Sequence, residues 1–157
     1  MKVGWAPWRM EYLKGRRERG CIFCNRVRRR RASDYIVHRG RWNFVILNKY
    51  PYNNGHLMVV PYRHAGRVEI LREGEMLEMF SLVQRAARAL NRTLKPEGLN
   101  IGMNVGRSAG AGIAGHLHLH VVPRWRADTN FMPILGETRF MVEHLHTTYR
   151  QLKKAWN

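Results

Sequence analysis

Acidic residues are scarce in this chain. Its 157 residues include 11 Asp and Glu against 28 Lys and Arg, a formal net charge of +17. Such an excess of cations indicates polyanionic partners, either nucleotides or nucleic acids. A solvated basic surface is the alternative for most of these residues. The densest run, Arg28–Arg31, has no interleaved aromatic residues on which bases would stack, so nucleic acid remains an alternative partner.

Long hydrophobic runs are also absent. No apolar run approaches the roughly 20 residues of a membrane span, and the N-terminus lacks the apolar region of a signal peptide. We therefore expect a cytoplasmic protein with no membrane partner. The length and 45% hydrophobic content favour one domain over residues 1–157. Residues 1–20, which are rich in aromatic and basic side chains, are expected to pack on this domain or on a partner subunit.

Only two cysteines occur, Cys21 and Cys24 in the sequence Cys-Ile-Phe-Cys. In a reducing cytosol this spacing indicates metal binding or redox chemistry rather than a structural disulfide. A redox role requires a following helix that lowers a thiol pKa, whereas the next residues lead into the arginine run. A metal site requires two more ligands, which the eight histidines can supply. Two small buried cysteines without a metal are the third interpretation.

Segments rich in β-branched and aromatic residues alternate with turn residues. They predict strands at Tyr35–His38, Phe44–Asn48, His56–Pro61 and Leu99–Asn104. Apolar residues recur every three or four positions between Glu73 and Thr93, which predicts a long helix. The stripe expected to face the core comprises Met76, Phe80, Val83, Ala87, Leu90 and Leu94. With a last helix at Glu143–Ala155, the element order predicts an α+β fold with an antiparallel sheet.

Three histidines alternate with aliphatic residues shortly before Pro123. A strand would place His116, His118 and His120 on one face and the intervening leucines on the other. Imidazole can act as a nucleophile, a proton carrier or a metal ligand near neutral pH. The pattern therefore predicts a row of imidazoles on a rigid strand.

A glycine-rich loop, Gly106–Gly115, runs directly into this row. Glycines allow backbone amides to approach phosphate oxygens, and Arg107 and Ser108 can add a charge and a hydroxyl donor. The loop and the histidines together predict a site at which imidazoles face a bound phosphorus atom.

The segment His116–Val122 closely resembles the signature of the histidine triad (HIT) superfamily, His-φ-His-φ-His-φ-φ with φ apolar. Further blocks along most of the chain are similar to the branch that contains diadenosine tetraphosphate phosphorylases and hydrolases. These blocks include Trp5-Ala-Pro-Trp-Arg, Cys21-Ile-Phe-Cys, Gly55-His56-Leu-Met-Val-Val-Pro and Asp128-Thr-Asn-Phe-Met-Pro. The resemblance implies a HIT-like fold, a homodimer, and an enzyme that cleaves dinucleoside polyphosphates through a nucleotidyl-histidine intermediate.

The resemblance also implies roles for individual residues. His118 would attack the α-phosphorus, while His120 and His56 would bind or protonate phosphate oxygens. Asn48 would bind the ribose hydroxyls. The other expected substrate-binding positions are Asn104, Gly106, Arg107, Ser108, Gly112 and His120. Zinc is the expected cofactor, with no organic cofactor, and its implied ligands are Cys21, Cys24, His64 and His116.

One departure from the family pattern bears on the reaction. Many members carry Gln shortly before the triad, and here the corresponding place is Ala111 or Gly112. This leaves room for inorganic phosphate rather than water as the acceptor. Two other functions remain open, a nucleoside 5′-phosphoramidase and a zinc-stabilised protein that binds RNA or another partner.

Overall fold

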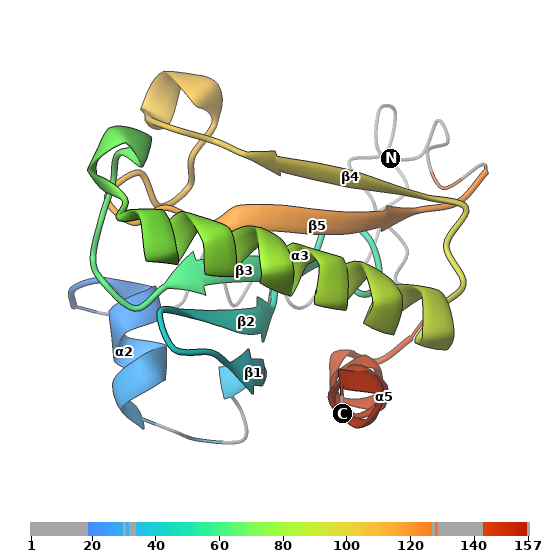
Figure 1. Cartoon of the computed structure of the whole chain (residues 1–157). Coiled ribbons are helices and arrows are strands. Elements are labelled where there is room, and N and C mark those ends of the chain that lie inside the picture. The colour runs from blue at the N-terminus through green and yellow to red at the C-terminus, as the bar shows by residue number, and fades with distance from the viewer. Residues whose placement is uncertain (1–18, 30, 32–33, 127, 129–142, 157) are drawn as a thin grey trace, which may run out of the picture.

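A five-stranded antiparallel sheet forms the centre of the computed structural model (Figure 1), which describes residues 19–29, 31, 34–126, 128 and 143–156. The strand order is β1-β2-β3-β5-β4. The strands are β1 (Ile36–Arg39), β2 (Asn43–Leu47), β3 (Leu57–Pro61), β4 (Gly98–Met103) and β5 (Leu119–Arg124). The helices are α2 (Ile22–Arg29), α3 (Glu73–Thr93) and α5 (Leu145–Trp156), with single 3-10 turns at Val68–Ile70 and Arg107–Ala109. The predicted α+β class, antiparallel sheet, long helix and C-terminal helix are confirmed.

Alternation along the strands divides the core between the two faces of the sheet. On one face, residues such as Val45 and Val59 pack under α3 and α5. On the opposite face, Phe44 and Val60 pack against Phe23 of α2. Figure 1 shows α3 crossing the front of the sheet, with α5 beside its C-terminal half. The three alternating histidines lie on the second of these faces, where Phe23 contacts the rings of His116 and His118.

The inward stripe of α3 differs from the predicted one. Its buried residues are Glu75, Met79, Leu82, Val83, Ala86, Ala89 and Leu90. The prediction was wrong for Met76 and Phe80, which are exposed. Glu75 takes an inward position because Arg63 donates to both of its carboxylate oxygens, over 2.9 and 2.6 Å. The ion pair satisfies this buried carboxylate, so the inward side of α3 holds an acidic residue while part of its apolar surface faces outward.

Helix α2 was not predicted. It begins directly after Cys21 and carries arginines in its last turn, where cations interact favourably with the helix dipole. Phe23 is its buried residue, and it anchors the helix to the sheet. The expectation for residues 1–20 falls almost wholly outside the described residues. None of the helices in the described ranges is long and apolar enough to cross a membrane.

Candidate active site

The three alternating histidines share one face, as predicted, but not one strand. Only His120 lies within β5, opposite Met58 of β3 and Gly102 of β4. His116 and His118 precede the strand, because the β3–β5 ladder ends at the pair Val59 and Leu119. There the backbone N–H of Leu117 donates instead to the carbonyl of Ala65, over 2.7 Å. The segment therefore stays extended and keeps the alternation without belonging to the sheet.

His118 has a defined orientation and tautomer. Its Nδ1 atom lies 2.9 Å from the carbonyl oxygen of His116. A carbonyl only accepts, so Nδ1 carries the proton and Nε2 keeps its lone pair. The ring is 5% exposed and contacts Phe23, with ring centroids 5.1 Å apart. Burial lowers the pKa of His118, and the neutral imidazole presents Nε2 as its free nitrogen.

His56 and His120 form a second hydrogen-bonded unit. The backbone N–H of Tyr52 donates to His56 Nδ1 over 3.1 Å, and the Asn48 amide nitrogen lies 3.2 Å from the same atom. His56 Nδ1 is therefore the acceptor and Nε2 carries the proton. This Nε2 lies 2.9 Å from His120 Nδ1. His120 Nδ1 accepts in turn, so His120 carries its own proton on Nε2.

Burial keeps this pair neutral. It lowers the pKa of His56 to about 3, with His120 and then His118 contributing further electrostatic repulsion. Burial, followed by repulsion from His118, lowers the pKa of His120 to about 4. At neutral pH the site thus holds an imidazole with a bare nitrogen beside an imidazole that presents an N–H group.

Two neighbours hold His56 in place: Gly55, which the sequence analysis named, and Tyr52, which it missed. The ring of Tyr52 stacks on the His56 imidazole, with centroids 4.9 Å apart and an interplanar angle of 23°. Gly55 adopts a φ of +83°, and a Cβ there would lie 2.4 Å from the Leu94 side chain. Glycine therefore lets β3 begin close against α3. The pair Gly55-His56 signals the turn in the sequence, whereas no sequence signal marks Tyr52.

The other predicted substrate-binding residues lie directly after β2 and in the segment between β4 and the histidine row. Asn48 is brought to His56, and its Oδ1 accepts from the backbone N–H of Tyr50 over 3.0 Å. Asn104 follows β4, whose Met103 pairs with Leu119 directly after His118. The loop beyond Asn104 thus begins next to the histidines.

Within this loop, Gly106 and Gly110 have φ angles of +83° and +84°, and the Asn104 amide donates to the Gly110 carbonyl over 3.5 Å. A positive φ is unfavourable for residues that have a Cβ, so glycine at both positions allows the loop to fold around its 3-10 turn. Arg107, Ser108 and Gly112 are exposed on it. The loop therefore offers a cation, a hydroxyl and backbone amides to solvent beside the histidine face.

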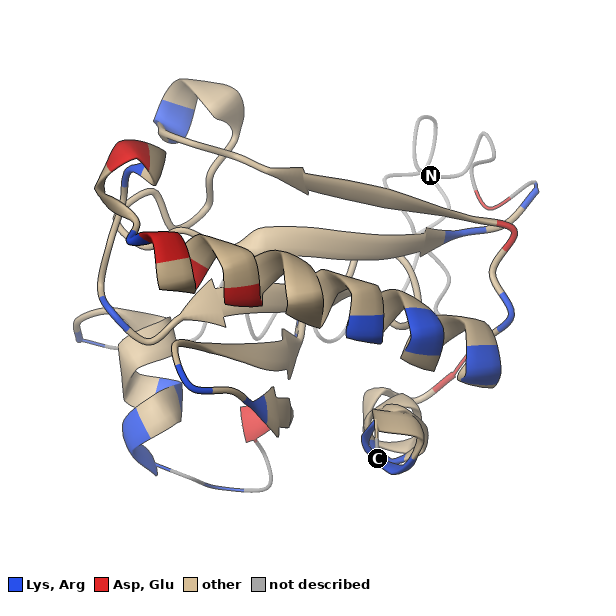
Figure 2. Cartoon of the chain, in the orientation of Figure 1, with Lys and Arg blue, Asp and Glu red and all other residues tan. Residues whose placement is uncertain are grey.

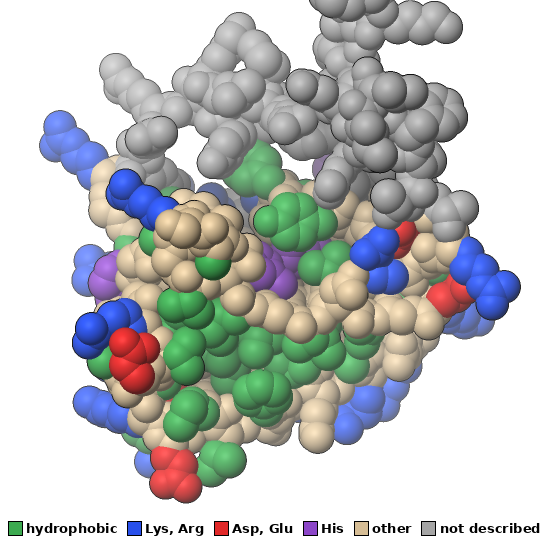
Figure 3. Space-filling model, turned by 90° about the horizontal axis from the view of Figure 1, so that it is seen from above, with side chains coloured by type: hydrophobic (Ala, Val, Ile, Leu, Met, Phe, Trp, Pro, Cys, Tyr) green, Lys and Arg blue, Asp and Glu red, His purple; other side chains and the backbone are tan. Residues whose placement is uncertain are grey.

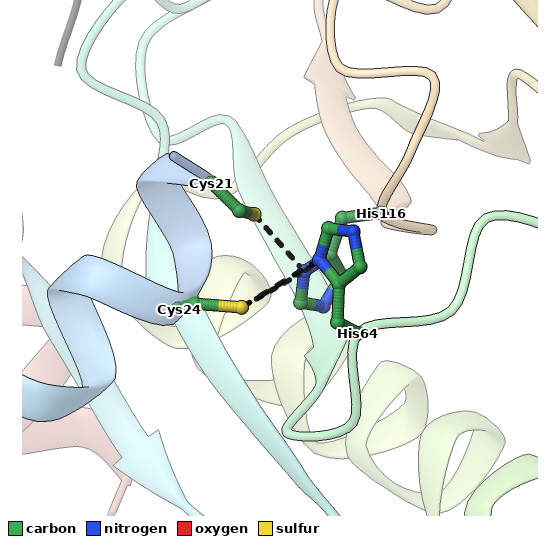
Figure 4. A group of neighbouring side chains, drawn as sticks. All are labelled: Cys21, Cys24, His64 and His116. Carbon is green, nitrogen blue, oxygen red and sulfur yellow. Dashed lines mark hydrogen bonds between the residues drawn. The ribbon is translucent and has the colours of Figure 1, made fainter. Parts of the chain in front are cut away.

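The first histidine of the row belongs to a separate cluster. Cys21 just before α2, Cys24 within it, His64 after β3, and His116 point toward a common centre (Figure 4). Each offers one ligand atom, and these atoms all lie within 4.8 Å of one another. The Cys21 Sγ and His64 Nδ1 atoms both lie 3.2 Å from His116 Nδ1, and Cys24 Sγ lies 3.6 Å from His64 Nδ1.

This geometry fits a tetrahedral zinc ion. Typical Zn–S and Zn–N bond lengths require ligand atoms about 3.3 to 3.8 Å apart, close to the separations in the cluster. Burial and the neighbouring Cys21 raise the pKa of the Cys24 thiol, and zinc binding would displace its proton. His116 Nε2 donates to the Pro61 carbonyl over 2.9 Å, which leaves Nδ1 as the ligand atom.

A family model described as "HIT domain" matches residues 30–127. The chain belongs to the HIT family. The match covers β1 to β5 and the three histidines, so the resemblance identified from the histidine pattern is confirmed.

Named relatives of this HIT protein include enzymes. It is 38% identical over 161 residues to "AP-4-A phosphorylase" of Mycobacterium tuberculosis, covering 97% of this chain and 83% of the relative. It is 28% identical over 97 residues to "Bis(5'-nucleosyl)-tetraphosphatase [asymmetrical]" of Schizosaccharomyces pombe, covering 62% and 53%. A zinc-bound histidine triad family protein of Mycobacterium smegmatis superposes with a TM-score of 0.72 at 27% identity, covering 87% and 93%.

Proposed function

We propose that this HIT protein cleaves dinucleoside polyphosphates such as diadenosine tetraphosphate, with His118 as the nucleophile. The observation that carries the proposal is the pairing of a bare Nε2 on His118 with an N–H-bearing Nε2 on His120. The two rings are adjacent, with centroids 4.8 Å apart. The similarity to an AP-4-A phosphorylase along nearly the whole chain supports the substrate class.

In the first step, His118 Nε2 attacks the α-phosphorus and the bond to the leaving nucleotide breaks. The new nucleotidyl-histidine keeps its Nδ1 proton, which the His116 carbonyl holds, so the imidazolium charge that develops has an acceptor beside it. His120 Nε2–H donates a hydrogen bond to the departing phosphate oxygen, where negative charge grows. The leaving nucleotide departs as an anion, so this step needs no proton transfer.

In the second step, an acceptor oxygen forms a bond to the phosphorus and the electron pair of the P–N bond returns to His118 Nε2. Covalent catalysis of this kind replaces one hard displacement by two easier ones. Inorganic phosphate as the acceptor would yield ADP, and water would yield AMP. The glycine-rich loop, with Arg107 and Ser108 exposed beside the site, offers donors for the anions. The loop has no Gln at the position that corresponds to Ala111 or Gly112, which supports phosphate rather than water as the acceptor.

Zinc would have a structural role in this protein. Cys21, Cys24, His64 and His116 would hold it, and it would supply a cross-link rather than a reacting group. Assigning His116 to the metal and His118 to the attack is chemically consistent, because a nitrogen bound to a metal is a poor nucleophile. The link would tie α2, and with it Phe23, to the segment that carries His118.

A homodimer is the proposed assembly. β4 is an edge of the sheet in the described part of the chain, and its Ile101 is 48% exposed. Leu77 and Phe80 of α3 are 66% and 62% exposed. Figure 3 shows hydrophobic side chains gathered on the face seen from above, the side on which β4 edges the sheet. An unpaired strand edge beside exposed apolar side chains favours a second copy as its partner.

The decisive experiment is incubation with diadenosine tetraphosphate, with and without inorganic phosphate. We expect ADP and ATP when phosphate is present, and a chain whose mass increases by one adenylyl group after rapid denaturation at alkaline pH, where the P–N bond survives. His118→Ala should abolish both turnover and the adduct while leaving the circular dichroism spectrum unchanged. Unchanged turnover in His118→Ala, or cleavage of a nucleoside phosphoramidate but not of the dinucleotide, would overturn the proposal.

A further inference from the structure

The basic residues of α3 are segregated along the helix. Its first turns carry Glu73, Glu75 and Glu78, whereas its second half carries Arg85, Arg88 and Arg92 (Figure 2). No acidic residue occurs between Glu78 and Glu97 in the sequence. The spacing of three and four residues places the arginines on one side of the helix, over about 10 Å of its length.

Helix α5 extends this positive surface. Arg85 and Arg92 of α3 reach the carbonyls of Trp156 and Ala155, over 3.4 and 3.5 Å, so the C-terminal end of α5 lies directly beside them. Helix α5 contains no acidic residue. We define the α3–α5 basic face as five exposed residues of the two helices: Arg88, Arg92, Arg150, Lys153 and Lys154.

Two cations of this face have partners within the fold: Arg92 donates to the Ala155 carbonyl, and Lys153 donates to the Tyr149 hydroxyl over 3.1 Å. The side chains of the other three form no hydrogen bond or ion pair with the described residues. Arg85, beneath it, is half-buried against His38 and the Trp156 ring, and so has a structural role. The side chains that α5 buries are Thr148, Tyr149, Leu152 and Trp156, none of which belongs to the face. Concentrating five like charges on one surface raises their mutual repulsion, which a bound polyanion would relieve.

We infer that the α3–α5 basic face binds the phosphate backbone of a nucleic acid, independently of the catalytic site. Helices α3 and α5 cover the face of the sheet opposite the histidines, so a bound strand would leave the nucleotide pocket open. The face contains no exposed aromatic residue for base stacking, which favours contacts to phosphates regardless of sequence.

An anionic membrane is the less suitable polyanion for this surface. Peripheral helices that bind membranes insert an apolar side into the lipid, but α5 buries its apolar side in the core. The exposed large hydrophobic residues of α3 are Met76, Leu77 and Phe80, all in its first two turns. The α3–α5 basic face itself thus has cations without an insertable apolar residue.

The test measures binding of the full chain to fluorescent oligonucleotides by anisotropy, over a series of salt concentrations. The probes are a duplex RNA, a duplex DNA and a single-stranded RNA of 20 nucleotides each, and binding to vesicles with anionic lipid is measured separately by cosedimentation. The variant combines Arg88→Gln, Arg92→Gln and Lys154→Gln. A control of equal charge combines Arg41→Gln, Arg67→Gln and Arg126→Gln, all exposed and outside both the α3–α5 basic face and the arginine run.

On duplexes, loss of three phosphate contacts should reduce the slope of log affinity against log salt by about 2.7. The control should keep the wild-type slope, and all three proteins should cleave dinucleoside polyphosphates equally. The inference is overturned by equal binding of all three proteins, by equal losses in variant and control, or by binding only to vesicles with anionic lipid. Because cleavage is measured separately, failure of this inference is distinguishable from failure of the proposed function.

Discussion

His56 Nε2 lies 2.9 Å from His120 Nδ1, and both rings are held neutral by burial. The backbone N–H of Tyr52 fixes the tautomer of His56. The contact between the two rings then fixes the tautomer of His120, whose Nε2 would face the substrate. His120 thereby presents a proton without carrying a charge. The nucleophile beside it is oriented separately, by the carbonyl of His116.

The buried position of His56 makes stability depend on pH. Its pKa is about 3 in the folded protein, below the ordinary value of 6.5. Between these values the unfolded chain binds a proton that the folded protein does not, so the free energy of unfolding falls as the pH is lowered. The contribution reaches at most about 1.4 kcal/mol per pH unit. Above pH 6.5 the contribution should be constant.

Denaturant unfolding of wild type and His56→Gln at several pH values checks this expectation. The variant should lose less stability than wild type on acidification from pH 6.5 toward 4. His146→Gln serves as the control, because His146 is exposed on α5. If His56→Gln and wild type lose stability in parallel, His56 is not the neutral buried group described.

Removing the donor at His120 should slow the chemical step. His120→Ala deletes the Nε2–H group while leaving His118 and its carbonyl contact in place. The loss of a donor that stabilises developing charge typically lowers kcat by about 10²–10³-fold. The loss should be smaller for an AMP ester of a strongly acidic phenol, whose leaving group needs less stabilisation. Equal losses with both substrates would contradict a role at the leaving oxygen.

Local pattern predicted the parts of the site that depend on strand alternation. The same alternation put His118 and His120 on one face and Leu119 in the core, although only part of the row lies in β5. The long helix was predicted with its observed bounds because its length makes the 3.6-residue period unambiguous.

What the sequence could not predict depends on contacts between distant residues. Glu75 turns inward only because Arg63 meets it from the segment after β3. Helix α2 has only eight residues, too few for a 3.6-residue period to show, and Phe23 finds its packing surface only on the assembled sheet. Which nitrogen of His120 carries the proton depends on the backbone N–H of Tyr52, acting through His56, and no sequence periodicity indicates these contacts.

Zinc should copurify with the protein at about one ion per chain. The Cys24 Sγ and His64 Nδ1 atoms lie 3.6 Å apart, within the range of ligand separations in a tetrahedral zinc site. Cys24→Ser should lower the zinc content and the unfolding free energy by several kcal/mol, since binding energy at a structural site is folding energy. Chelation of the wild-type protein should produce a similar loss.

Elemental analysis and thermal unfolding of the same samples check the zinc prediction. Cys24→Ser tests the cluster as a whole, and Ser81→Ala on the exposed side of α3 is a neutral control. A preparation without zinc whose Cys24→Ser variant unfolds like wild type would mean that the four side chains are only packed together.

The apolar residues on the outer side of α3 should support the dimer. Leu77→Glu and Phe80→Glu place charges on side chains that are 66% and 62% exposed, so the isolated chain loses little packing. At an interface the same charges would be desolvated without a partner, which costs more than 2 kcal/mol each by typical values. Light scattering should therefore report a dimer for wild type and a monomer for the double variant.

The helical content of the double variant should equal that of wild type, because neither residue belongs to the core of the sheet. Gln84→Glu adds a charge one turn further along α3, at an exposed position outside the apolar group. This control should remain dimeric. If the double variant stays dimeric as well, the exposed apolar surface on α3 does not hold the subunits together, whereas a monomeric wild type would exclude the assembly altogether.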